Sequence, residues 1–263
     1  MEAIGAVAKQ SCLCLHAVVD ANGLEQIDEP ALLLVRHEDL GCVVRLVQSS
    51  EYADAHPENS RDQLDWLAPR AMQHHDLLLK LMRFTTVVPL KFASLCASTD
   101  DVGEMLRDHY ERFRQLIEYL RSREEWSVNL YVDKDAALRR LEKSEPTLRE
   151  FDELALMRPN GEAYLLRKKK TKLANELFVA RFSALQRELC ARLKHCVVDI
   201  TTLAKPRDVR MEFHQLLFSV AVLMSKHEMP SIEQELALFE SEYAEDGLVA
   251  ELCGPWPPYS FIS

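Results

Sequence analysis

Glycine is scarce in this chain, and the glycine-rich motifs of many enzymes are missing. Only 7 of the 263 residues are glycine, which leaves little material for loops that cradle a phosphate group. The sequence has no Gly-x-Ser-x-Gly nucleophile elbow, no Walker loop and no Gly-x-Gly-x-x-Gly run. Acidic pairs are plentiful, but they fall on the surfaces of predicted helices with no sign of a pocket. We therefore expect no catalytic residues and predict that the chain is not an enzyme.

Metal-binding cysteine motifs are also missing. The seven cysteines are an odd number and include no Cys-x-x-Cys pair. A zinc site needs paired Cys or His ligands at set spacing. The adjacent His74 and His75 cannot chelate one ion together, because neighbouring side chains on a helix point about 100° apart. We expect reduced thiols and predict neither a metal nor another cofactor.

Positive charge is in the minority, and long apolar runs are absent. The chain has 32 Lys and Arg residues against 42 Asp and Glu residues, a net charge of −10. Nucleic acids and anionic membranes attract basic surfaces, so neither is expected as the main partner. The longest apolar run, residues 216–224, contains a serine and is far below the roughly 20 residues of a membrane span. No secretory signal is evident either, so we expect a cytoplasmic location.

The first part of the chain combines predicted strands with helices. Residues 12–19, 31–36 and 41–47 are apolar runs of strand length. A helix near Pro69 follows, and residues 101–121 predict one amphipathic helix with Thr99 or Asp100 as N-cap. The earlier helix has an apolar stripe at 3.6-residue spacing that places His75 in the core. Its members are Ala71, Met72, His75, Leu78, Leu79 and Met82.

A short charged link at residues 122–125 precedes a second pattern of elements. A strand is followed by two short helices and a long one, two β-rich stretches, a helix and a last strand. This is the order of a split βαβ, ferredoxin-like arrangement with extra helices in its first crossover. The long helix can reach about 50 Å, so part of it should project or bend. The expected ranges are 127–132, 134–143, 146–159, 161–195, 197–203, 211–224, 231–246 and 248–252.

The last ten residues join prolines with aromatic side chains. Three prolines in the four positions 255–258 exclude a helix or a central strand. A free solvated tail rarely keeps aromatic residues, so we expect an extended clamp docked on its own protein or on a partner. A disordered terminus is the alternative.

The tail and three internal blocks resemble the gas vesicle protein F/L family. The tail block is LCGPWPPYSF at residues 252–261, and WLAPRA at 66–71, VVPLKFA at 87–93 and EWSVNLYVD at 125–133 follow the family order. Four positions depart from the family pattern. Lys91 stands in place of Arg, Ala93 and Ser127 in place of Gly, and Asn129 in place of Lys.

The resemblance implies a fold, a location and partners. It implies an α+β N-terminal domain, a modified ferredoxin-like C-terminal domain with inserted helices, and a minor component of the gas vesicle in the cytoplasm. The implied partners are the main gas vesicle shell protein and other accessory proteins, and the implied role is to assist early assembly and to limit aggregation. We predict domains at 1–122 and 123–253, with the tail 254–263 docked across both.

Three groups of residues are candidates for partner or interdomain contacts. The tail contributes Trp256, Pro257, Pro258, Tyr259 and Phe261, which we expect to clamp the two domains together. Lys91 favours a structural ion pair, with a partner contact as the alternative. The run Arg167, Lys168, Lys169 and Lys170 is either a solvated helix face or a dock for an acidic surface. Its mate within the chain would be the acidic helix that carries Glu233 to Asp246, and contact of that helix with another copy of the chain is the alternative.

Two other classes of function remain open on the sequence. A ferredoxin-like sheet can serve a regulatory module that binds a small ligand. Such sheets can also present aromatic side chains to RNA bases, although the net charge of −10 argues against this function.

Overall fold

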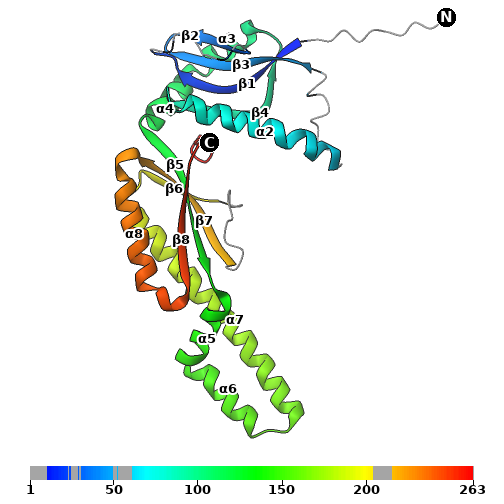
Figure 1. The fold of residues 1–263 in the computed structure, drawn as a ribbon, viewed down its shortest axis with the longest axis vertical. Helices are drawn as coiled ribbons and strands as arrows, with labels where there is room; N and C mark the ends of the chain where they lie inside the picture. The colour runs from blue at the N-terminus through cyan, green and yellow to red at the C-terminus, as the bar shows by residue number, and fades with distance from the viewer. Residues whose placement is uncertain are drawn as a thin grey trace, which may run out of the picture. The chain divides into compact units, whose positions relative to one another are not determined.

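The structure, a computed structural model, describes residues 11–22, 24, 29, 31–49, 52, 61–203 and 215–262, with the side chains of 61–65 left aside. It has an α+β fold with two four-stranded sheets, which confirms the predicted fold class (Figure 1). The chain divides into two compact units. The N-terminal unit comprises the described residues up to Glu124 and the tail from Trp256 onward, and the C-terminal unit is Glu125–Pro255. No described helix is long and apolar enough to span a membrane.

The sheet of the N-terminal unit is antiparallel and has the order β2-β3-β1-β4. Helix α2 packs its Leu77 and Leu78 against Ala17 and Val19 of β1. Strand side chains alternate between faces, so the fully buried Val18 points to the opposite face. Helices α3 and α4 also contact the sheet. The bounds are β1 (Ser11–Asp20), β2 (Leu32–His37), β3 (Leu40–Gln48), β4 (Val87–Cys96), α2 (Arg61–Leu81), α3 (Thr99–Asp108) and α4 (Tyr110–Leu120).

Helix α2 buries a different stripe from the one the sequence predicts. Met72 is 63% exposed, and His74, not His75, lies in the core. The reason is that α2 has two neighbours. The buried residues His74, Leu77, Leu78 and Leu81 lie on its core side, while the tail contacts it at His75.

The single helix predicted at 101–121 is two helices, α3 and α4. The backbone leaves the helical region at His109 (φ −113°, ψ 16°), and this residue is exposed. The N-cap is Ser98 rather than Thr99 or Asp100. Its hydroxyl accepts a hydrogen bond from the Asp101 N–H at 3.2 Å, and the Asp101 carboxylate accepts one from the Ser98 N–H at 3.0 Å. This reciprocal capping box satisfies donors that would otherwise be left unpaired at the helix start.

The C-terminal unit has the predicted order of strand, helices, two strands, helix and strand. Its sheet order is β6-β7-β5-β8. Residues 204–214, which include the start of the strand expected at 211–224, lie outside the described residues. The bounds are β5 (Arg123–Val132), α5 (Lys134–Ser144), α6 (Pro146–Leu156), α7 (Asn160–Leu193), β6 (Asp199–Thr202), β7 (Gln215–Ser225), α8 (Met229–Glu242) and β8 (Leu248–Trp256).

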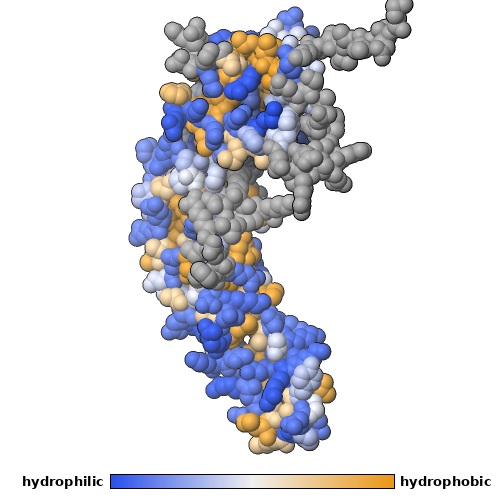
Figure 2. All heavy atoms as spheres, turned by 45° about the vertical axis from the view of Figure 1, so that its right-hand side comes forward, coloured by the Kyte–Doolittle hydropathy of each residue, from blue (hydrophilic) through white to orange (hydrophobic). Residues whose placement is uncertain are grey.

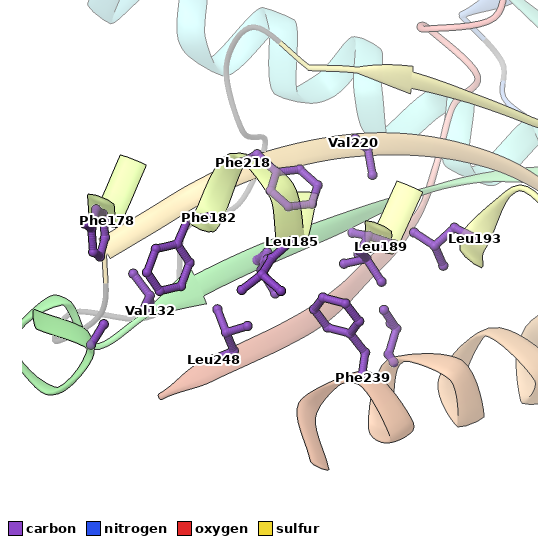
Figure 3. Close-up of a cluster of buried hydrophobic side chains, with 14 of the residues drawn as sticks. Val132, Phe178, Phe182, Leu185, Leu189, Leu193, Phe218, Val220, Phe239 and Leu248 are labelled. Atoms are coloured by element: carbon purple, nitrogen blue, oxygen red, sulfur yellow. The ribbon is translucent and has the colours of Figure 1, made fainter. Parts of the chain in front are cut away.

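The core of this unit lies between the sheet and the C-terminal half of α7. Phe178, Phe182, Leu185 and Leu189 of α7 meet Val132, Val220 and Leu248 of the strands, and Phe239 of α8 joins the same cluster (Figure 3). The N-terminal half of α7 instead lies beside α6 in a helical hairpin that extends beyond the sheet (Figure 1). The long helix therefore projects, as expected from its length.

Strand β8 runs farther than predicted. We expected it to end at Leu252, but it continues through Pro255 to Trp256. It lies at the edge of the sheet, where a proline without an N–H donor is tolerated. The first part of the tail is thus the end of an edge strand.

Candidate partner-binding surfaces

The tail from Trp256 onward packs within the N-terminal unit, against helix α2. Pro257, Pro258 and Phe261 are buried. The Tyr259 ring stacks on His75 with centroids 6.2 Å apart, and its hydroxyl lies 3.3 Å from His75 Nδ1. The Trp256 ring lies 5.8 Å from the same imidazole. His75 is therefore the centre of the tail's docking site on α2.

The tail holds its shape through a tight turn. The Tyr259 N–H donates to the Pro257 carbonyl at 2.7 Å, and the Phe261 N–H donates to the Pro258 carbonyl at 3.3 Å. The sequence predicts a docked tail but not the site on which it docks. No local pattern connects His75 to a residue 184 positions later. A tail position that also reaches the other unit stays a prediction.

Gly254, the first residue of the predicted tail, lies at a crowded position. Its φ is +151°, and a Cβ atom added there would lie 2.9 Å from two ring atoms of Trp126. Real Cβ atoms do not approach a ring this closely, so only glycine fits without a shift of the backbone or the indole. Steric crowding thus explains why glycine precedes Pro255 in the tail block.

Lys91 is exposed on β4. The structural ion pair that we favoured for it is not found in the described part of the chain. Its neighbour Phe92 packs edge-on against His74 with centroids 5.6 Å apart. A partner contact for Lys91 stays a prediction.

The basic run of α7 divides into one partly buried residue and three exposed ones. The Lys170 side chain is 13% exposed, and its Nζ lies 2.8 Å from Asp152 of α6 and 3.2 Å from Glu142 of α5. Burial disfavours its charge, but the hydrogen bonds to these carboxylates outweigh burial and raise the pKa of Lys170. Lys170 therefore ties the hairpin together, whereas Arg167, Lys168 and Lys169 are exposed.

The acidic helix at the C-terminal end is not the mate of this run. Arg192, near the other end of α7, lies 3.4 Å from Glu235 and also pairs with Glu242. Arg181 binds Asp246 through two nitrogens, at 2.6 and 3.1 Å. Glu235, Glu242 and Asp246 are thus paired with arginines that the sequence pattern did not single out.

A buried histidine pair lies between β1 and α2. The Nδ1 atoms of His16 and His74 are 2.9 Å apart, and both rings are buried. Burial, followed by the neighbouring His74 and Arg45, lowers the pKa of His16 to about 3. Burial also lowers the pKa of His74. No group of three or more His, Cys, Asp or Glu side chains that could hold a metal occurs among the described residues.

Comparisons with known proteins agree on one family. Residues 12–263 match the family model described as gas vesicle synthesis protein GvpL/GvpF. Gas vesicle protein L of Streptomyces sp. is 30% identical over 234 residues, covering 89% of this chain and 83% of that protein. Gas vesicle protein L1 of Halobacterium salinarum is 23% identical over 261 residues, covering 94% and 89%.

Solved structures show the same fold. The crystal structure of the gas vesicle protein GvpF from Anabaena sp. PCC7120 is similar with a TM-score of 0.70 at 18% identity, covering 96% of this chain and 98% of that one. The GvpF structure from Microcystis aeruginosa has a TM-score of 0.60 at 17% identity. Both likenesses support the α+β fold described above.

Proposed function

This chain belongs to the GvpL/GvpF family of gas vesicle synthesis proteins, and from that premise we propose that it binds the main gas vesicle shell protein and assists its assembly. It does so as a minor component of the vesicle, by contact alone and without bond-making chemistry. Other gas vesicle accessory proteins are further partners. The family match over residues 12–263 is the observation that carries this proposal.

The physical need for such a protein follows from the task of the shell. A subunit that faces gas must present a large apolar surface, and such surfaces self-associate in water unless they are covered. A chain with a net charge of −10 resists aggregation itself. Both of its units also keep apolar side chains exposed, among them Phe84 and Leu156. These features support a role in which the chain binds the apolar surface of the shell protein and stays in solution.

Co-expression with the shell protein tests the proposal. We expect an affinity tag on this chain to retain the shell protein, and the soluble yield of the shell protein to rise with expression of the chain. An unrelated acidic protein with the same tag is the control. Equal retention and equal soluble yield with the control would contradict the proposal.

A further inference from the structure

The free end of the α6–α7 hairpin carries exposed apolar side chains, and a cluster of lysines follows it along α7. Leu156 and Met157, at the end of α6, are 84% and 81% exposed, and Tyr164 and Leu165 of α7 are also exposed. Figure 2 shows apolar residues among hydrophilic ones at this end. Four large exposed apolar residues within ten positions are more than scattered surface residues would give, and such clusters mark interaction sites.

These residues continue into a strip along the outer face of α7. Leu165, Lys168, Lys172, Glu176 and Val179 follow one another at intervals of three or four residues, so they share one side of the helix. An open hollow lies over the strip from Tyr164 to Asn175, and a second continues to Ala180. At 1.5 Å per residue the strip is about 24 Å long, enough for a partner helix of four turns.

The charge on this strip is opposite to that of the whole chain. Lys168 on the strip and Lys169 at its border are exposed, and no ion pair joins either of them to a carboxylate in the described part of the chain. Among the described residues, the one carboxylate within ion-pair distance of Lys172 is that of Glu176, 3.8 Å away on the same helix. A negatively charged partner is therefore attracted here and repelled by most of a molecule whose net charge is −10.

We infer that the outer face of α7 between Tyr164 and Ala180 docks an acidic amphipathic helix of another protein. Leu165 and Val179 contact the apolar side of that helix, and the lysines pair with its carboxylates. A second copy of this chain fits less well, because the acidic residues Glu235 and Glu242 of its α8 are already paired with Arg192. The inference stands whether or not the shell protein supplies the helix.

A labelled peptide tests this surface on the full chain. The probe is an 18-residue helical peptide with glutamates on one side and leucines on the other, measured by fluorescence anisotropy. The comparison peptide carries lysines in place of the glutamates. We expect the acidic peptide to bind at least tenfold more tightly than the basic one, and to weaken when NaCl is raised from 50 to 500 mM.

Matched variants locate the binding. Lys168→Glu/Lys172→Glu and, separately, Leu165→Ser should each weaken the acidic peptide at least tenfold while the melting temperature is unchanged, because all three positions are exposed. Lys80→Glu/Arg112→Glu makes the same charge change on exposed helix positions of the N-terminal unit and should leave binding intact. Equal binding to all variants, or no binding of the acidic peptide, would overturn the inference. The inference would also be overturned if the chain bound phosphatidylglycerol vesicles instead of the acidic peptide. Self-association of the chain that Lys168→Glu/Lys172→Glu abolishes would overturn it as well.

Discussion

At the scale of single residues, the His16–His74 pair makes stability depend on pH. The folded pKa of His16 is about 3, against about 6.5 in an unfolded chain. The unfolded chain therefore takes up a proton below pH 6.5 that the folded chain does not accept, and the free energy of unfolding falls as the pH falls. Above pH 6.5 the pair has no such effect. The loss is about 1.4 kcal/mol per pH unit for each histidine that stays neutral when folded.

Urea denaturation between pH 7.5 and 4.5 measures this slope. The double variant His16→Leu/His74→Leu removes both titrating groups and should show a flatter dependence, whatever its absolute stability. A slope that is the same in the wild type and the double variant would contradict the buried neutral pair.

Gly254 is the residue whose replacement should be least tolerated near the tail. An alanine there brings Cβ to 2.9 Å from the Trp126 ring at a φ of +151°. We expect Gly254→Ala to lower the free energy of unfolding by about 2 kcal/mol. The control is Gly161→Ala in α7, where an added Cβ has no neighbour within 4 Å and should be neutral or stabilising. Equal effects of the two substitutions in urea denaturation would refute the steric account.

Ala93 pays a conformational penalty on β4. Its φ is +63°, in the left-handed region that costs an L-residue about 1–2 kcal/mol and that glycine adopts freely. This conformation explains why the family pattern that the chain resembles has glycine at this position. We expect Ala93→Gly to raise the free energy of unfolding by about 1 kcal/mol. The control is Ala180→Gly, in an exposed part of α7, which should lower the free energy of unfolding by about 1 kcal/mol. A lower free energy of unfolding for Ala93→Gly would contradict the conformational penalty at Ala93.

At the scale of elements, local patterns predict the order of strands and helices but not the neighbours of each one. Alternation and capping signals are local, and they give the sequence of elements in the C-terminal unit correctly. The prediction of which α2 residues are buried was wrong, because that helix packs against both the core and a tail from the other end of the chain. The break at His109 was missed because the apolar pattern runs through it, and only backbone geometry reveals it.

The candidate contact residues show the same division. Composition singles out the basic run, but burial between Glu142 and Asp152 separates Lys170 from its exposed neighbours. Such a distinction depends on tertiary packing, and a charge run on a sequence carries no sign of it. For the same reason, the sequence did not indicate that the tail packs against His75.

The docked tail should contribute to the stability of the N-terminal unit. Phe261 is 9% exposed, so Phe261→Ala removes a buried ring and should cost about 3 kcal/mol, seen as a melting temperature several degrees lower. Tyr164→Ala removes an aromatic ring that is exposed and should change the melting temperature little. If Phe261→Ala melts like the wild type but no longer binds the shell protein, the tail is a partner-facing motif instead of a clamp.

At the scale of the whole molecule, the chain is an acidic protein with two α+β units and one locally basic hairpin. Membership in the GvpL/GvpF family places it among gas vesicle proteins. Three features favour a function through protein–protein contacts. They are the exposed apolar side chains, the positive strip on an otherwise acidic molecule, and the tail held by stacking and burial. We propose that these surfaces keep the shell protein from associating with itself before assembly.

Light scattering of the shell protein tests this claim most directly. Purified shell protein is diluted out of denaturant into buffer that contains zero to two molar equivalents of this chain. We predict that scattering falls with each addition and reaches a plateau at a fixed stoichiometry. Scattering that matches the same amounts of an unrelated acidic protein would contradict the account.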